Sequence, residues 1–127
     1  MNPFDKYFGG EDKLQIQVTQ YLSIQYPKIF WSHATNESRR SPFERYKAIK
    51  FGIRAGIPDI MIYDQKRIKS TDSIQFAGLA IELKFGKNKP TDTQKKCLEE
   101  LRKRYWATAI CYTLSVTIIR GPNLLYL

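Results

Sequence analysis

Two carboxylates and a lysine lie at the edges of two apolar segments, and their chemical types suit metal-ion chemistry. Asp59 closes the element 56–59 (GIPD), and Glu82 and Lys84 lie in the apolar segment 79–84. Burying an unpaired carboxylate costs free energy, so a proton, a cationic partner or a metal normally neutralises it. Hard divalent cations take oxygen ligands, and a bound cation activates water and polarises phosphoryl oxygens. The pattern therefore indicates a Mg²⁺ or Mn²⁺ site that hydrolyses phosphodiesters.

The alternation of side chains along a strand determines which of these groups can meet. Glu82 and Lys84 project to the same side of a strand over 76–85. Asp59 can project to that side as well if its own segment pairs with this strand. We expect Asp59 and Glu82 to be catalytic metal ligands, and the carbonyl of Leu83 can supply a third oxygen. Lys84 is expected to orient the attacking water and to offset charge that develops on the phosphate.

An exposed Glu–Lys pair on one face of a sheet is the competing interpretation, because the Glu-x-Lys pattern alone is common. The element upstream favours the metal site. Pro58 is permitted just before a strand, and Gly56 can relieve crowding where a metal and a phosphate approach.

Hydrophobic periodicity and capping signals predict the helices that must hold these residues. Leu14, Val18 and Leu22 share one face of a helix expected over 11–25. Ser41 as N-cap and Pro42 at the first position predict a helix over 43–50. Thr91 and Gln94 form a capping box for a helix that reaches about residue 105. Its inward positions are expected to be Cys97, Leu98, Leu101 and Tyr105.

Strands are expected over 29–31, 59–63, 76–85 and 107–113, with polar turns at 34–42 and 64–73. The second and third strands should form a hairpin. The last strand follows a helix and should therefore run parallel to its partner. This order predicts an α/β fold with a mixed central sheet flanked by helices. The length fits a single domain over residues 1–127.

The charge balance points to a polyanionic partner. Lys and Arg number 21 against 12 for Asp and Glu, a net charge of +9, and the pI is near 9.6. No segment has the ~18 apolar residues of a membrane span, and the N-terminus shows no secretory pattern. Cys97 and Cys111 fit reduced core thiols. We therefore expect a cytoplasmic protein that binds nucleic acid and no membrane.

A dense basic segment precedes the GIPD element, and further lysines follow Glu82. Arg and Lys side chains can hold backbone phosphates with little readout of sequence, although a charged segment is more often only a solvated surface. The residues expected to face DNA are Arg39, Arg40, Arg45, Lys47, Lys50, Arg54, Lys87 and Lys89.

The strings GIPDIMIYD, AIELKFG and PTDTQKKCLEEL, in this order, resemble the VRR-NUC family of the PD-(D/E)XK nuclease superfamily. The resemblance covers about residues 11–111. It implies the restriction-endonuclease-like core and hydrolysis of DNA that depends on Mg²⁺ or Mn²⁺. Small stand-alone members, of phage and bacterial type, are homodimers that act on branched DNA such as four-way junctions. Versions fused to larger repair proteins act on flaps and ends.

The resemblance also implies roles for residues that spacing alone does not assign. Glu11 matches the acidic residue of the family's first helix, which implies a metal ligand, while the alternative is a carboxylate that interacts with the helix dipole. Asp12 competes for either role. Gln94 matches a family glutamine near the phosphate or the attacking water, and its capping box explains it equally well. The run His33, Asn36 and Glu37 is a candidate contact to substrate, although a lone histidine is more often structural.

Two other functions compete with a structure-selective nuclease. A nuclease fold that has lost activity would bind DNA without cutting, yet neither the carboxylates nor the lysine are missing. A restriction-type enzyme would cut a duplex at a specific sequence, yet no base-reading motif stands out. The apolar tail 124–127 is either an interface between subunits or a last strand of the core.

Overall fold

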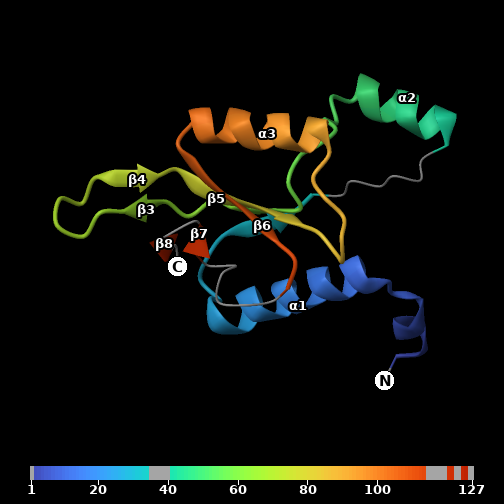
Figure 1. Ribbon diagram of the computed structural model, residues 1–127, viewed down its shortest axis with the longest axis horizontal. Coiled ribbons are helices and arrows are strands. Elements are labelled where there is room, and N and C mark those ends of the chain that lie inside the picture. The colour runs from blue at the N-terminus through green and yellow to red at the C-terminus, as the bar shows by residue number, and fades with distance from the viewer. Residues whose placement is uncertain (1, 35–40, 114–119, 122–123, 126–127) are drawn as a thin grey trace.

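A four-stranded mixed sheet lies between two helices, and a third helix stands apart from it (Figure 1). The computed structural model describes residues 2–34, 41–113, 120–121 and 124–125. The elements are the 3₁₀ helix η1 (Pro3–Tyr7), α1 (Gly10–Gln25), β1 (Trp31–His33), α2 (Pro42–Lys50), β2 (Ile60–Ile62), β3 (Lys66–Arg67), β4 (Ile74–Phe76), β5 (Gly78–Leu83), α3 (Asp92–Lys103), β6 (Trp106–Cys111), β7 (Arg120–Gly121) and β8 (Leu124–Leu125). The described helices include none that is both long and apolar enough to cross a membrane.

The sheet has the strand order β1-β2-β5-β6. Strand β2 is antiparallel to both β1 and β5, whereas β5 runs parallel to β6. Every residue of β5 is buried, because the strand is central and a helix lies over each face of the sheet. The expected antiparallel pairing of β2 with β5 is confirmed, and so is the parallel direction of β6, which a helical crossover allows.

Helix α1 covers one face of the sheet through an apolar stripe at the predicted positions. Leu14, Val18 and Leu22 are buried and belong to one core cluster with the β5 residues Ile81 and Leu83. Residues four apart share a helix face, and alternate residues share a strand face. Glu82, between Ile81 and Leu83, must therefore face the opposite side of the sheet. The helix begins at Gly10, one residue before the predicted start.

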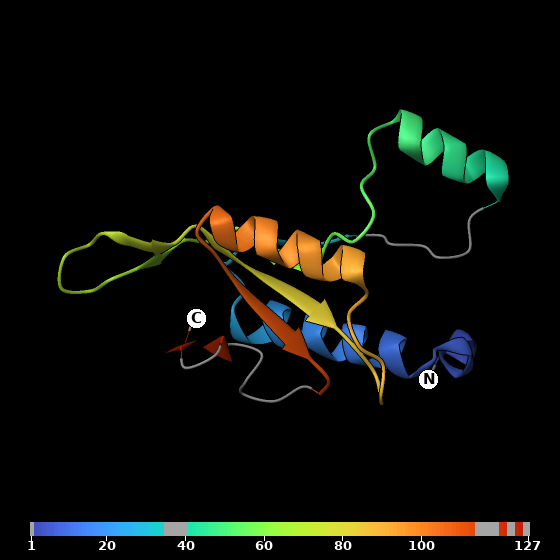
Figure 2. The same ribbon diagram turned by 45° about the horizontal axis from the view of Figure 1, so that its top comes forward.

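Helix α3 covers that opposite face (Figures 1 and 2). Thr91 caps it as predicted, and the capping box with Gln94 is present. Leu98 is buried and Cys97 and Leu101 are partly buried, in agreement with the expected inward positions. Tyr105 is the exception, since it is 75% exposed. The helix ends at Lys103, and Tyr105 occupies the turn before β6 with a φ of 66°, so helical periodicity no longer orients it.

The first strand and the turn after β2 differ from the prediction. The apolar run 29–31 predicted a strand, but β1 spans Trp31–His33 because the antiparallel register with β2 pairs Trp31 with Ile62 and His33 with Ile60. The segment predicted as a polar turn contains β3, which pairs with β4. An edge strand with polar residues gives a weak sequence signal, because one of its sides needs no apolar partner.

Two parts project from the sheet at opposite ends (Figures 1 and 2). One is the β3–β4 hairpin. The other is α2, whose predicted cap at Ser41 is confirmed, with Glu44 completing a capping box. Phe43, Ile49 and Phe51 are exposed on or next to this helix. In the C-terminal tail, β8 pairs with β7, and residues 126 and 127 lie outside the described residues.

Candidate active site

Asp59 and Glu82 meet where β2 begins and β5 ends. The register pairs Ile60 with Ile81, so one residue further it places Asp59 opposite Glu82. The Leu83 N–H donates a hydrogen bond of 2.7 Å to Asp59 Oδ2. This bond fixes the Asp59 carboxylate against the last residue of β5. The two carboxylates that the sequence pattern singled out are therefore neighbours on the α3 face of the sheet.

Glu82 is a buried carboxylate with an incomplete set of partners. The residue is 1% exposed, and its Oε2 atom has no hydrogen-bond partner among the described residues. The pKa of Glu82 is raised to about 8, chiefly by burial and also by the Asp59 charge, while the Lys84 charge opposes the rise. A carboxylate in this position is costly to ionise without another positive charge.

Lys84 is the cation paired with this carboxylate in the described part of the chain, and it too is buried. Its Nζ lies 3.7 Å from Glu82 Oε1, longer than a charge-assisted hydrogen bond. The Lys84 backbone N–H donates to the Cys111 carbonyl at 2.9 Å, which ties the end of β5 to the end of β6. Lys84 therefore offsets the carboxylate charge only in part.

The glycine of the GIPD element has a packing role that differs from the expected one. Gly56 has a φ of 83°, and a Cβ there would lie 2.8–3.0 Å from the side chain and backbone of Thr93, in the first turn of α3. We expected this glycine to make room for a metal and a phosphate. The structure shows that it lets the chain before Asp59 pass against α3, while Pro58 is fully buried beside it. Room for a metal and a phosphate stays a prediction.

Glu11 reaches toward the site from the start of α1. Gly10 lies against the ring of Phe85, just past β5, where a Cβ would meet the ring atoms at 2.5–2.6 Å. Partial burial raises the pKa of Glu11, the Lys84 charge opposes the rise, and the Asp59 charge adds to it. Asp12, the competitor for this role, caps the helix instead, because its Oδ2 accepts a 3.1 Å hydrogen bond from the Gly9 N–H.

The Gln94 side chain is engaged in the N-terminal cap of α3. Its Oε1 accepts a 2.8 Å hydrogen bond from the Thr91 N–H, and the backbone N–H of Gln94 donates to Thr91 Oγ1 at 3.2 Å. The capping interpretation is thus confirmed. A role for Gln94 near the phosphate stays a prediction.

His33 makes a contact that the sequence did not predict. Its Nδ1 lies 2.8 Å from the carbonyl oxygen of Asp59. The contact could not be predicted because the predicted strand ended at Trp31, two residues before the end of β1 at His33. A strand that included His33 would have placed its ring beside the start of β2.

Comparison with known proteins identifies the family and supports the fold. The model of the VRR-NUC domain matches residues 10–114. The chain belongs to the VRR-NUC domain family. This is a family of nuclease-type, DNA-processing domains. A solved structure described as a VRR_NUC domain protein superimposes with a TM-score of 0.66 at 24% sequence identity, covering 84% of this chain and 80% of the other, which supports the fold. The search of curated proteins returned no match.

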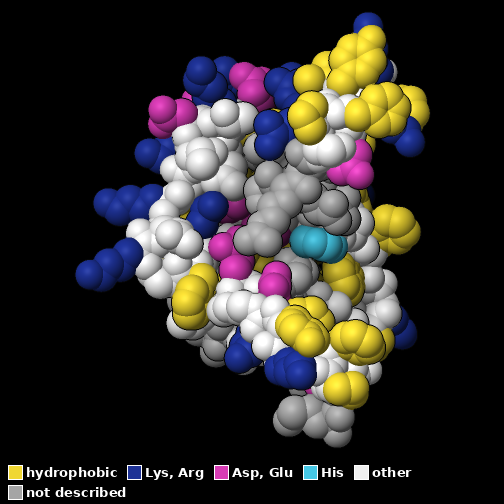
Figure 3. Space-filling view, turned by 90° about the vertical axis from the view of Figure 1, so that its right-hand side faces the viewer, with side chains coloured by type: hydrophobic (Ala, Val, Ile, Leu, Met, Phe, Trp, Pro, Cys, Tyr) yellow, Lys and Arg dark blue, Asp and Glu magenta, His cyan; other side chains and the backbone are white. Residues whose placement is uncertain are grey.

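Basic side chains surround the acidic centre of this VRR-NUC domain. Figure 3 shows acidic side chains gathered near the middle of the face, with the only histidine beside them and lysines and arginines around the margin. The predicted DNA-facing residues Arg45, Lys47, Lys50, Arg54, Lys87 and Lys89 are exposed. The remaining candidates, Arg39 and Arg40, lie outside the described residues, as do Asn36 and Glu37.

Cys97 on helix α3 interacts electrostatically with one of the basic residues and with a carboxylate of the site. Burial raises the pKa of the Cys97 thiol, the Arg54 charge lowers it, and the Glu82 charge raises it. Cys97 therefore lies within electrostatic reach of both groups. Both cysteines are free, as expected.

The donor set of the VRR-NUC site fits a hard divalent cation. A buried pair of carboxylates with one oxygen lacking a partner supplies oxygen ligands and an unmet need for positive charge. In the described part of the chain, no three His, Cys, Asp or Glu side chains form a ligand cluster by themselves. Mg²⁺ tolerates this, since it commonly uses one or two carboxylates and completes its shell with water and substrate phosphate.

Proposed function

We propose that this VRR-NUC domain is an endonuclease, dependent on Mg²⁺ or Mn²⁺, that hydrolyses phosphodiesters in branched DNA during replication or repair. One observation carries the proposal: Glu82 is buried beside Asp59, with a raised pKa and an oxygen atom that no described residue satisfies. A purely structural role for Glu82 would not explain why a second carboxylate, Asp59, lies beside it. A site for a divalent cation can use both carboxylates as oxygen ligands.

Asp59 and Glu82 would hold the cation, with Glu11 and the Leu83 carbonyl as further oxygen donors. When bound, the cation supplies Lewis-acid activation of a phosphoryl oxygen and of water. Lys84, with its ammonium held next to Glu82, orients the attacking water and offsets the negative charge of the transition state. Gln94, at the start of α3, contacts the phosphate or the water.

The DNA would lie across the exposed lysines and arginines that border the site. Neutralisation of several phosphates makes such binding strongly dependent on salt. Two observations support a contribution from α2: the helix stands away from the body (Figure 2), and its lysines, Lys47 and Lys50, are exposed. Cutting two strands symmetrically requires two copies of the site, so the proposed active form is a homodimer.

The test incubates the protein with labelled four-way junction, flap and linear duplex, with and without Mg²⁺. We expect metal-dependent cleavage of the branched substrates, and none by Asp59→Ala or Glu82→Ala variants that still bind DNA. Light scattering on the same samples gives the oligomeric state. Cleavage that persists in both variants would contradict the proposal. Binding without cleavage by the wild-type protein would assign a non-catalytic DNA-binding domain, and preferential cutting of one linear duplex a restriction-type enzyme.

A further inference from the structure

We infer that His33 is a positioning residue that fixes the Asp59 carboxylate in the orientation that binds the metal. The inference rests on the proposed function and adds a residue to it. The His33 ring meets the backbone of Asp59 through Nδ1, 2.8 Å from the carbonyl oxygen. A carbonyl oxygen only accepts hydrogen bonds, so Nδ1 must carry the proton. The proton position on the ring is thereby assigned.

The sheet itself does not require this hydrogen bond. The Ala34 N–H already donates to the same Asp59 carbonyl at 2.9 Å, and it continues the antiparallel ladder between β1 and β2. The carbonyl is therefore satisfied before His33 contributes. An exposed histidine without a role could hydrogen-bond to water at no cost. The hydrogen bond from His33 to the Asp59 carbonyl therefore needs another explanation.

Asp59 is held from both neighbouring strands. On the β1 side, Ala34 and His33 bind its carbonyl, and on the β5 side the Leu83 N–H binds its Oδ2 atom. Asp59 lies one residue before β2 begins, next to the turn that contains Gly56. Two donors on the carbonyl restrict rotation of this peptide, and so they restrict the direction in which the carboxylate leaves the backbone.

The place of His33 on the surface agrees with this role. His33 is exposed, and Figure 3 shows its ring beside the acidic side chains at the centre of this face. With Nδ1 bound to Asp59, the Nε2 atom on the other side of the ring makes no hydrogen bond with a described residue. A direct contact between Nε2 and substrate is the alternative that the experiment must separate.

Three substitutions separate the two nitrogens. The Asn side chain places an N–H close to the position of Nδ1, whereas Gln places one close to Nε2. We expect His33→Ala to weaken Mn²⁺ binding by roughly ten-fold, the lower end of the range for residues that orient metal ligands. His33→Asn should restore most of that affinity, and His33→Gln should resemble His33→Ala. Calorimetric titration with Mn²⁺ in the absence of DNA measures the effect without reference to cleavage.

Two controls separate positioning from general stability. The melting temperature of the metal-free variants should stay near that of the wild type, because His33 is exposed. Ser32 lies in β1 next to His33, and its hydroxyl is hydrogen-bonded to the Tyr63 hydroxyl. Ser32→Ala removes this bond and should leave the Mn²⁺ affinity unchanged. Because the chain has one histidine, nitrogen-15 NMR of its ring reads the proton at Nδ1 without assignment.

The outcomes distinguish this inference from the proposed function. Equal Mn²⁺ affinity in the wild type and His33→Ala overturns the inference, as does rescue by Gln instead of Asn, which would assign the role to Nε2. In either case wild-type cleavage and its loss in Asp59→Ala leave the nuclease proposal intact. If the wild-type protein binds no Mn²⁺, the proposed function fails together with this role of His33.

Discussion

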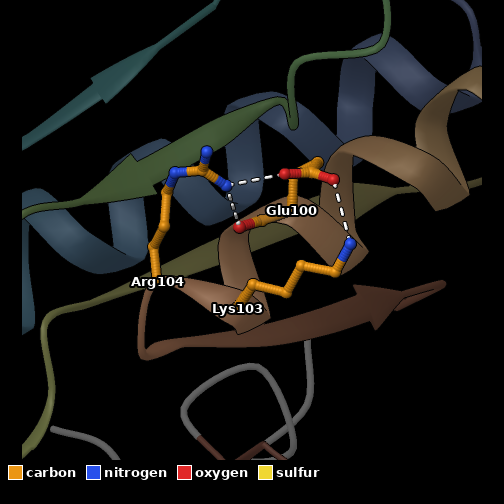
Figure 4. Close-up of polar contacts among 3 residues, drawn as sticks. All are labelled: Glu100, Lys103 and Arg104. Atoms are coloured by element: carbon orange, nitrogen blue, oxygen red, sulfur yellow. Dashed lines mark hydrogen bonds and ion pairs between the residues drawn. The ribbon is translucent and has the colours of Figure 1, made fainter.

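Two glutamates of this protein pair with basic side chains, one inside the fold and one on its surface. Glu82 faces Lys84 at 3.7 Å, and both side chains are almost fully buried. Glu100, on the outer side of α3, contacts Arg104 at 2.7 Å and Lys103 at 3.2 Å (Figure 4). The pKa of Glu82 is raised chiefly by burial, whereas hydrogen bonds from Arg104 and Lys103 lower the pKa of Glu100.

The difference shows that the pair with the shorter contacts is the one that contributes less to stability. The Glu100 contacts are shorter and cost little, because water solvates both partners, and such pairs add little to stability. The Glu82 pair is longer, is removed from water, and has a second carboxylate beside it. Selection for stability alone would favour an apolar residue in such a position. The buried pair therefore supports the proposed binding of a cation.

The largest effect is expected from a substitution of the buried glutamate, Glu82. Glu82→Gln keeps the size of the side chain but removes the negative charge, so we expect cleavage of junction DNA to fall by roughly a thousand-fold or more, as for loss of a major electrostatic contribution to catalysis. Glu100→Gln is the surface control and should leave the cleavage rate unchanged. Single-turnover kinetics at saturating Mg²⁺ measure both. Similar losses in the two variants would remove the distinction between them.

The pH dependence of stability should also follow the buried glutamate. Because the folded state raises the pKa of Glu82 from 4.5 to about 8, the folded protein holds a proton that the unfolded chain has released. The resulting stabilisation is full below about pH 4.5 and is lost as the pH rises toward about 8, with a total on the order of a few kcal/mol. Urea unfolding of the metal-free protein at several pH values measures it.

Glu82→Gln should flatten this profile between pH 5 and 8. The contribution of Glu100 to the pH dependence of stability has the opposite sign, because its lowered pKa gives stability at neutral pH that is lost as the pH falls below 4.5. A wild-type protein that becomes more stable from pH 5 to pH 8 without metal would contradict the assignment to Glu82.

Mn²⁺ should stabilise the folded protein through the buried site alone. Binding to the folded state at a hundred-fold excess over Kd contributes about 2.7 kcal/mol, which raises the melting temperature by several degrees. Asp59→Ala should abolish the rise, and Glu100→Ala should retain it. Thermal unfolding with a metal series gives the comparison. A rise in Asp59→Ala equal to that of the wild type would place the cation elsewhere.

The sequence predicted the parts of the fold whose causes are local. The caps at Ser41 and Thr91 and the apolar stripe of α1 depend on residues within a few positions of one another, and all three are confirmed. The neighbouring carboxylates were predicted as well, because alternation along β5 and an antiparallel partner determine the side to which Asp59 and Glu82 project.

Contacts between distant segments were not predictable in the same way. The bounds of β1 depend on its register with β2, so the contact of His33 with Asp59 depended on a pairing that the apolar run 29–31 did not reveal. The role of Gly56 likewise depends on the approach of α3 at Thr93, which no spacing in the sequence encodes.

A smaller effect is expected from two glycines that share a backbone conformation. Gly52 and Gly56 have φ values of 80° and 83°, but a Cβ on Gly52 meets nothing within 4 Å. Gly52→Ala should cost ~1 kcal/mol from the left-handed backbone alone. Gly56→Ala adds a clash with Thr93, so we expect a further ~1–3 kcal/mol and reduced Mn²⁺ affinity. Equal unfolding free energies for the two variants would show that α3 moves aside freely.

The smallest effect is expected from the surface pair itself. Arg104→Ala removes the 2.7 Å contact with Glu100 and a 2.8 Å hydrogen bond to the Glu100 carbonyl, yet all of these groups are exposed to water, which replaces the lost partners. We expect the melting temperature to change by about one degree or less, with Mn²⁺ affinity and cleavage of junction DNA unchanged. If Arg104→Ala weakened DNA binding while the melting temperature held, the outer side of α3 would belong to the DNA-binding surface. In that case the Glu100 pair would no longer serve as a control without function, and the comparison with the Glu82 pair would have to rest on substitutions of Glu100 alone.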